Sequence, residues 1–254
     1  MNILFTCVGR RKYLVDYFQQ EKLVDKVIGT DMSNTAPALA GCDSWYQVPG
    51  IYEPEYIDKI IEICKSEEIE AVISLNDMEL PILAKNREQF NRVGIQLIIS
   101  NDEVIKVSSD KWKTYLLCIE NDIPTPISFI DLNLAIEALN HEMVKYPLIV
   151  KPRWGSASFS LQIVNTNKEL TAAFIKCKQD INESYLSRFK ESDKDVLIQE
   201  FIKGNEFGVD IFNDMSGVFR GLVCKRKLAM RAGETEKATT VASTPFEISA
   251  KKIS

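Results

Sequence analysis

The N-terminal part of the chain alternates short apolar runs with longer amphipathic ones. Short runs rich in β-branched and aromatic residues predict strands, and longer runs with apolar residues three or four positions apart predict helices. The predicted strands are 3–8, 26–30, 45–48, 71–75 and 96–100, and the predicted helices are 12–20, 54–66 and 79–90. Strands that alternate with helices in this way are typical of a doubly wound parallel sheet.

After Asn101 the pattern changes to that of an α+β module. An Ile-Pro-Thr-Pro connector follows two short helical segments, and its prolines favour an extended backbone. The last three predicted strands look antiparallel, with turns at Lys203-Gly204 and 213–217, and a charged stretch at 182–194 precedes them. The predicted helices are 102–107, 110–120, 132–143 and 168–177, and the predicted strands are 127–130, 148–151, 159–164, 196–202, 206–213 and 218–227. We place a boundary near Ser108, which gives domains 1–107 and 108–254.

Polar residues follow several predicted strands of the first domain. Doubly wound sheets bind ligands at the carboxyl ends of their strands, here near Gly9-Arg10, Asp31 and residues 76–79. The first turn has one glycine where dinucleotide-binding proteins have GxGxxG. The sequence therefore argues against a Rossmann-type NAD enzyme.

The most informative segment of the second domain is a lysine followed by a turn of small residues. The apolar run 147–150 leads into Lys151, and Gly155, Ser156 and Ser158 lie in the turn. Backbone N–H groups and hydroxyls in such a turn can surround a phosphate while the ammonium group neutralises its charge. The turn lacks the GxxxxGK[ST] pattern of a P-loop, so a surface hairpin remains the alternative.

The composition predicts a soluble, globular, cytoplasmic protein. The chain has 254 residues, 45% of them hydrophobic, which is enough for one large domain or two modest ones. A formal net charge of -5 gives no general attraction to nucleic acid or an anionic membrane. No apolar run reaches the ~20 residues of a membrane span, and the apolar N-terminus precedes its basic residues, unlike a signal peptide. Six scattered cysteines indicate reduced thiols, and the single histidine, His141, is expected on a solvent-facing helix.

Four motifs occur in the order that is typical of one family. They are Ser109-Asp110-Lys111-Trp112, then Ile-Pro-Thr-Pro at 123–126, Val-Lys-Pro-Arg-Trp-Gly-Ser-Ala-Ser at 150–158, and Gln-Glu-Phe-Ile-Lys-Gly-Asn-Glu-Phe-Gly-Val-Asp at 199–210. With these motifs the chain resembles the ATP-grasp superfamily, in particular relatives of the carbamoyl-phosphate synthase large subunit and of carboxylate-amine ligases. The resemblance implies an α/β protein with a Rossmann-like pre-ATP-grasp domain followed by an α+β ATP-grasp module.

The resemblance also implies how the chain holds the nucleotide phosphates. Lys111 and Lys151 resemble the two lysines that bind the phosphates, by neutralising the charge of their oxygens. Residues 155–158 resemble the mobile loop that closes over the terminal phosphate and removes water from it.

Three residues in and after this loop differ from many relatives of that family. Ala157, Phe159 and Ser160 stand where those relatives have further glycines, which leaves the mobility of the loop open. Two tryptophans flank the proposed site. We expect Trp112 to pack in the core and Trp154 to shield the phosphates.

The second long motif resembles the part of the family that binds the nucleoside. Strand 196–202 offers a flat apolar edge and an acidic residue, which suit an adenine ring and a ribose. Glu200, Phe201 and Ile202 resemble the hinge that contacts the adenine, and Glu206 resembles the ribose-binding carboxylate. An edge-strand charge is the alternative for Glu206, and Asp210 is expected on the same face of its strand.

The acceptor side of the site is assigned by position. Arg231 lies in a basic segment, 225–234, that resembles the approach to the acyl-acceptor site. It is the candidate catalytic residue, because a guanidinium binds a carboxylate or a phosphoryl group bidentately; a surface loop position is the alternative. Asn76, Asp77 and Glu79 are candidates to face the second substrate, although Asn-Asp before a helix is also a good N-cap.

The function that the resemblance implies is ATP-dependent ligation. ATP with Mg²⁺ phosphorylates a carboxylate or bicarbonate, and an amine then displaces phosphate from the acyl phosphate. The partners are small carboxylate and amine molecules, with a possible homodimer through the first domain. The family's magnesium ligands lie in a late segment, and this chain stops at Ser254 before such a motif, so we expect an incomplete ATP-grasp module and assign no metal ligand. A nucleotide-binding module without ligase activity is the alternative.

Overall fold

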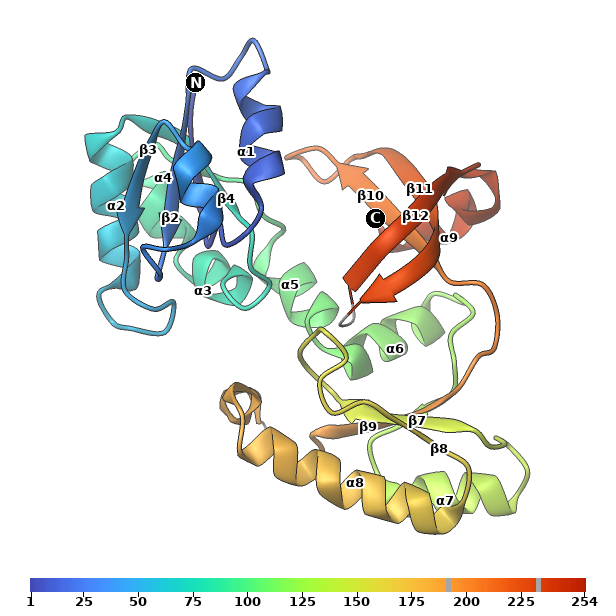
Figure 1. Cartoon of the computed structure of the whole chain (residues 1–254). Helices are drawn as coiled ribbons and strands as arrows, with labels where there is room; N and C mark the ends of the chain where they lie inside the picture. The colour runs from blue at the N-terminus through green and yellow to red at the C-terminus, as the bar shows by residue number, and fades with distance from the viewer. Residues whose placement is uncertain (191–192, 232–233) are drawn as a thin grey trace. The chain divides into compact units, whose positions relative to one another are not determined.

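The chain forms two compact units, Met1–Lys106 and Val107–Ser254 (Figure 1). The structure is a computed structural model that describes residues 1–190, 193–231 and 234–254, with the side chain of residue 234 left out. Within these ranges no helix has both the length and the apolar character that a bilayer crossing requires. All six cysteines are free thiols, and each is buried or half-buried.

Unit 1 is built on a five-stranded parallel sheet in the order β3-β2-β1-β4-β5. The strands are β1 (Asn2–Thr6), β2 (Lys26–Asp31), β3 (Ser44–Gln47), β4 (Ile69–Ser74) and β5 (Gln96–Leu97). The connecting helices are α1 (Lys12–Gln19), the 3-10 helix η1 (Pro37–Gly41), α2 (Tyr56–Ser66), α3 (Leu80–Lys85) and α4 (Arg87–Asn91), and α5 (Asp102–Ser108) leads into unit 2. This topology confirms the predicted doubly wound sheet.

Neighbouring residues of the central strand β1 pack into two separate cores. Leu4 packs in a core that includes Ile60 of α2, whereas Phe5 packs in a core that includes Val15 of α1. Successive side chains of a strand point to opposite faces, so both faces of the sheet are covered by helices. Burial on both faces explains why β1 and β2 each have four consecutive buried residues without alternation of buried and exposed positions.

The predicted helix 79–90 is wrong in one respect, because it is two helices. The chain leaves helical geometry at Asn86, which has φ -102 and ψ 8 and lies between α3 and α4. The Asn86 side-chain amide donates to the carbonyl of Ile82 at 2.8 Å. Asparagine side chains compete in this way with backbone hydrogen bonds, which favours a helix end.

Unit 2 contains a four-stranded antiparallel sheet in the order β6-β9-β7-β8. Its strands are β6 (Ser128–Phe129), β7 (Leu148–Pro152), β8 (Gln162–Val164) and β9 (Val196–Glu200). Helices α7 (Leu132–Asn140) and α8 (Asn167–Asn182) lie on one face of this sheet, and α6 (Lys111–Glu120) precedes it (Figure 1). The charged stretch 182–194 contains a 3-10 helix, η2 (Tyr185–Phe189), whose Leu186 is buried; Glu191 and Ser192 lie outside the described residues.

A second antiparallel sheet of unit 2 has the order β10-β11-β12. It consists of β10 (Phe207–Asn213), β11 (Phe219–Arg231) and β12 (Glu234–Val241), followed by η3 (Thr244–Phe246) and α9 (Glu247–Ile253). Lys252 of α9 donates to the carbonyl of Asn121 at 2.8 Å, directly after the last turn of α6. The sequence did not predict β12 or α9, since their residues are mainly polar.

The prediction that residues 196–202 pair with the following strand is wrong. β9 pairs with β6 and β7 of the first sheet, and Lys203-Gly204 belongs to the connection between the two sheets. Val196, Leu197 and Ile198 are all fully buried. A strand with three consecutive buried residues needs a central position, which it has between β6 and β7.

Candidate functional site

The site begins at the N-terminus of α6, where Asp110 caps the helix. The Asp110 carboxylate accepts hydrogen bonds from the backbone N–H groups of Trp112 at 3.0 Å and Lys113 at 3.3 Å. These are donors of the first helical turn that have no partner inside the helix. Lys111 is therefore the first helical residue, and its own N–H donates to the carbonyl of Arg153 at 3.1 Å.

The Lys111 side chain lies against the turn that follows β7. Its ammonium group donates to the carbonyl of Gly155 at 2.7 Å and lies 3.4 Å from the carbonyl of Arg153. Burial, and then repulsion from the Lys151 ammonium group, lowers the pKa of Lys111 to about 8, and the Asp110 carboxylate opposes this. The structure thus brings together Lys111, Lys151 and the glycine turn.

Lys151 is held by a chain of hydrogen bonds across the sheet. It lies in β7, and its ammonium group donates to Gln199 Oε1 of β9 at 2.7 Å. Gln199 Nε2 donates in turn to the hydroxyl of Ser128 in β6 at 2.8 Å. Burial lowers the pKa of Lys151 as well. Both ammonium groups are therefore partly desolvated cations, that of Lys111 at the turn and that of Lys151 on the sheet before it.

The turn itself depends on left-handed backbone. Gly155 has φ +86, and a Cβ there would lie 3.0 Å from Leu186 Cδ2. Ala157, Ser158 and Ser160 also have positive φ, at 56, 56 and 48. Two of the positions where relatives have glycine thus keep a left-handed conformation without glycine, which stores backbone strain.

The two ends of the turn differ in exposure. Ser156, Ala157 and Ser158 are exposed, whereas the Ser160 hydroxyl donates to Asp180 Oδ2 of α8 at 2.7 Å. The hydroxyls and N–H groups at the tip therefore face solvent beside the two lysines. Trp154 differs from its prediction, because it is buried in the core of unit 2; the half-buried Trp112 contacts Tyr115, with ring centroids 5.2 Å apart.

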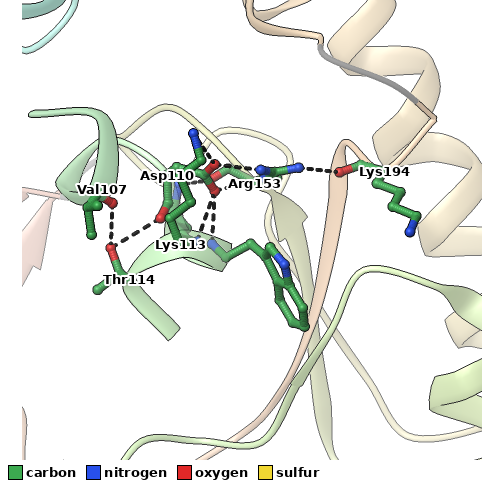
Figure 2. Close-up of polar contacts among 8 residues, drawn as sticks. Val107, Asp110, Lys113, Thr114, Arg153 and Lys194 are labelled. Atoms are coloured by element: carbon green, nitrogen blue, oxygen red, sulfur yellow. Dashed lines mark hydrogen bonds and ion pairs between the residues drawn. The ribbon is translucent and has the colours of Figure 1, made fainter. Parts of the chain in front are cut away.

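A buried ion pair connects the start of α6 to the turn (Figure 2). Arg153 Nε donates to Asp110 Oδ1 at 2.8 Å, and Arg153 Nη2 donates to Oδ2 at 2.6 Å. Only 2% of the Asp110 side chain and 7% of the Arg153 side chain are exposed. The Arg153 guanidinium also lies 4.7 Å from the centre of the Trp154 ring.

The three residues of the predicted adenine-binding hinge follow one another at the end of β9. Glu200 Oε2 accepts from the N–H of Ile127 at 3.4 Å, and the N–H of Phe201 donates to the carbonyl of Pro147 at 3.3 Å. Ile202 is 60% exposed. The hinge is thus an open apolar edge beside the first sheet.

The predicted ribose-binding carboxylate lies at the start of the second sheet. Glu206 contacts the Lys227 ammonium group at 2.5 Å and Asp210 contacts that of Lys225 at 2.8 Å. Lys225 and Lys227 are two positions apart on β11, so Glu206 and Asp210 share one face, as predicted.

The candidate catalytic residue Arg231 lies at the end of β11. Its side chain is 81% exposed and reaches Glu236 Oε1 at 3.5 Å. Among the residues that the structure describes, no hydrogen bond or ion pair joins Arg231 or Glu206 to either site lysine. Ala232 and Gly233, which belong to the predicted acceptor segment, lie outside the described residues.

The three candidates of unit 1 separate into different roles. Asn76 Oδ1 accepts from the N–H of Met78 at 3.0 Å, and Asp77 is exposed. Glu79 occupies the N-cap position of α3 without a side-chain cap bond, because its carboxylate is fully buried. The carboxylate accepts from three hydroxyls, those of Thr6, Tyr56 and Ser74, at 2.6, 2.5 and 2.6 Å. Glu79 is therefore a buried structural acceptor in unit 1.

The chemistry of the side chains around the lysines does not fit a metal ion. In the described part of the chain, no three His, Cys, Asp or Glu side chains cluster as metal ligands would. The lysines contact backbone carbonyls and the Gln199 amide oxygen, and both oxygens of the nearby Asp110 carboxylate are engaged by Arg153, so no free carboxylate of the kind that Mg²⁺ prefers is shown there in the described part of the chain. His141 is exposed at the end of α7, as predicted.

Three residues that support the lysines have no role predicted from the sequence. Asp110 and Arg153 lie inside two of the motifs, and Gln199 opens a third, yet none was given a role. A helix-capping aspartate is recognisable from sequence. That the same carboxylate reaches Arg153 depends on a long-range contact that local pattern does not contain.

Two family profiles match the chain. The profile of the PylC-like N-terminal domain matches residues 3–98, and the profile of the ATP-grasp domain matches residues 144–252. They correspond to the parallel-sheet unit and to the part of unit 2 that carries Lys151, the turn, strands β7, β8 and β9 of the first antiparallel sheet and the whole second sheet.

Known proteins resemble the chain over nearly its whole length. A carbamoyl-phosphate synthase of Methanobrevibacter smithii is 25% identical over 217 residues, which cover 83% of this chain and 52% of that protein. The L-amino acid ligase from Bacillus licheniformis has a TM-score of 0.72 and 20% identity, covering 99% of this chain and 60% of the ligase. The biotin carboxylase from Campylobacter jejuni, solved as a β-γ-ATP complex, has a TM-score of 0.74 and 17% identity, covering 99% and 59%.

The chain thus spans about half of the curated relative's length, at 52%, and the likeness to the solved structures concerns the fold. The predicted order of a Rossmann-like domain followed by an ATP-grasp module is confirmed by the profiles and by these structures. On these grounds the chain belongs to the ATP-grasp superfamily.

Proposed function

We propose that the chain binds ATP through Lys111, Lys151 and the turn 155–158, and that it serves an ATP-dependent ligase. The observation that carries this proposal is that two partly buried ammonium groups repel one another, one of which, Lys111 Nζ, lies 2.7 Å from the Gly155 carbonyl of the turn. Two buried cations that repel one another are unfavourable without an anion. A polyphosphate between them removes that cost.

The turn adds donors to this charge. Ser156 and Ser158 are exposed at its tip, so their hydroxyls and backbone N–H groups are accessible to a phosphate. Fixed donors beside cations stabilise phosphate charge in a site from which water is excluded. We therefore assign Gly155, Ser156 and Ser158 to the phosphates.

The nucleoside is assigned to the end of the first sheet. Glu200, Phe201 and the exposed Ile202 offer backbone groups and an apolar edge to an adenine. Glu206 is the ribose ligand in this proposal. Its carboxylate is 64% exposed, so it can leave the Lys227 ammonium group and accept hydrogen bonds from the ribose hydroxyls. The solved β-γ-ATP complex of the Campylobacter biotin carboxylase supports nucleotide use in this fold.

The reaction proposed is phosphorylation of a small carboxylate, or bicarbonate, followed by displacement of phosphate by an amine. The protein contributes mainly positioning and charge neutralisation, without a protein nucleophile. Arg231 is the proposed contact of the substrate carboxylate or transferring phosphoryl group. Mg²⁺ is expected with ATP, but the described side chains at the lysines do not supply its ligands.

The alternative, a nucleotide-binding module without ligase activity, is not favoured by the comparisons. The carbamoyl-phosphate synthase and the L-amino acid ligase are named for synthesis and ligation. These names are the reason to prefer ligation over nucleotide binding alone.

ADP release tests the ligase directly. The chain is incubated with ATP, Mg²⁺ and a panel of carboxylates paired with amines, and ADP is measured with a coupled assay. The expected result is ADP release that needs both members of one pair and is lost in Lys151→Ala. Nucleotide binding without ADP release for any pair would support the binding module instead.

A further inference from the structure

The Asp110–Arg153 ion pair is the most completely buried charged contact beside the proposed site. Both bonds of the pair are short, 2.8 and 2.6 Å, and the two side chains are only 2% and 7% exposed. Burying two charges has a large desolvation cost, so such a pair contributes little net stability compared with apolar side chains. Bidentate geometry instead fixes the orientation of both partners.

Each residue of the ion pair lies next to, or within two positions of, a residue proposed to bind phosphate. Asp110 caps α6 one residue before Lys111. The Arg153 carbonyl accepts from the Lys111 N–H at 3.1 Å, and the Arg153 N–H donates to the carbonyl of Asp195 at 2.9 Å. Arg153 also lies between Lys151 in β7 and Gly155 in the turn. This ion pair therefore joins α6, which carries Lys111, to β7 and the turn, which carry the other residues proposed to bind phosphate.

We propose that Asp110 and Arg153 are positioning residues for phosphate recognition: their ion pair holds the Lys111 ammonium group and the 155–158 turn in register to bind the phosphates of a nucleotide. The proposal rests on the proposed ATP site. Neither residue contacts the ligand in it; each acts through Lys111 and the turn.

Electrostatics supports the same role. Burial and the repulsion from Lys151 lower the pKa of Lys111, and the Asp110 carboxylate raises it; the net result is a pKa of about 8. Loss of the carboxylate charge therefore both loosens the turn and reduces the fraction of Lys111 that is cationic near neutral pH.

The test uses Asp110→Asn, because asparagine keeps the N-cap and the shape but loses the charge. The matched control is Asp214→Asn. Asp214 also caps a turn, through the N–H groups of Ser216 and Val218, and pairs with Arg220, but the pair is exposed and lies in the hairpin of the second sheet. Both variants lose one carboxylate charge from an Asp–Arg pair, and melting curves establish that both are folded.

The probes are the ATP analogue AMP-PNP and adenosine, which lacks phosphate. We expect Asp110→Asn to weaken AMP-PNP binding by about tenfold, the effect of one charge-assisted hydrogen bond, and to leave adenosine binding unchanged. Its AMP-PNP affinity also declines from a lower pH than that of the wild type. Asp214→Asn is expected to bind both probes as the wild type does.

A double-mutant cycle separates positioning from general damage. In a Lys111→Met background, Asp110→Asn is expected to cause a clearly smaller loss of AMP-PNP affinity than in the wild type, since the part of its effect that runs through Lys111 is already gone and only the part that runs through the turn remains. If Asp110→Asn lowers AMP-PNP and adenosine affinity alike, or lowers AMP-PNP affinity equally with and without Lys111, the positioning role is wrong. If wild type and Lys151→Ala both fail to bind AMP-PNP, the ATP site and this inference are both wrong. If the wild type binds AMP-PNP and Asp110→Asn binds it equally well, the positioning role is wrong but the ATP site stands.

Discussion

At the scale of single residues, the site is defined by how two lysines are kept charged while partly buried. The pKa of Lys111 is lowered from 10.5 to about 8 and that of Lys151 is also lowered. Between about pH 8 and 10.5 the unfolded chain binds more protons at Lys111 than the folded chain does. The free energy of unfolding therefore rises with pH across that window. Below about pH 8 the burial of the charged Lys111 destabilises the folded chain to its full extent.

Phosphate binding should reverse this shift, which gives a first prediction. Nearby negative charge raises the pKa of Lys111, so AMP-PNP binding at pH 8 is expected to take up a fraction of a proton. Calorimetry in buffers of different ionisation enthalpy measures that fraction. Lys111→Arg is the control, because arginine stays charged and should bind without proton uptake at this residue. A binding enthalpy for the wild type that does not depend on the buffer would contradict the assignment.

The backbone of the turn makes a second prediction. Gly155→Ala places a Cβ at φ +86 and 3.0 Å from Leu186 Cδ2, so the free energy of unfolding is expected to fall by about 1–3 kcal/mol. Ala157→Gly is the matched reverse change at φ 56. Glycine relieves backbone strain in the folded state but adds conformational freedom to the unfolded chain. These effects oppose one another, so the free energy of unfolding is expected to change by less than about 1 kcal/mol. Urea denaturation measures both, and equal effects of the two changes would rule out the backbone explanation.

At the scale of elements, sequence periodicity predicted most helices and strands, because most of them bury an apolar face. The strands of unit 1 and helix α6 were both predicted, although the capping role of Asp110 was not. The break at Asn86 and the pairing of β9 did not follow. Both depend on contacts that residue order does not specify: a side-chain bond within a helix in one case, and the burial of three consecutive residues in the other.

Glu79 shows the same limit and makes a third prediction. Its position before α3 is that of a cap, yet three hydroxyls surround it in the interior of unit 1. Glu79→Ala leaves three hydroxyls without their acceptor, two of them on the buried residues Thr6 and Tyr56, and the free energy of unfolding is expected to fall by about 3 kcal/mol or more. Asp77→Ala, two residues away and exposed, is expected to change it by less than about 0.5 kcal/mol. Chemical denaturation of the two variants compares them directly, and similar losses would show that the hydroxyl cluster does not depend on Glu79.

At the scale of the whole molecule, the order of motifs was more informative than any single motif. Each unit folds around its own core, and the family profiles match one segment in each. The lysines were predicted from motif order, whereas their supports, Asp110, Arg153 and Gln199, became visible only in three dimensions. Specific substrates depend on side chains of the acceptor region, which vary within a fold while its backbone does not.

In the proposed site, Lys111, Lys151 and the turn 155–158 hold the phosphates of ATP. The most direct test of this assignment is isothermal titration of the chain with AMP-PNP and Mg²⁺, beside Lys151→Ala and the exposed-lysine control Lys65→Ala. We expect the wild type and Lys65→Ala to bind equally and Lys151→Ala to bind at least about tenfold more weakly. Equal binding by the wild type and Lys151→Ala, or no binding by the wild type, would contradict it.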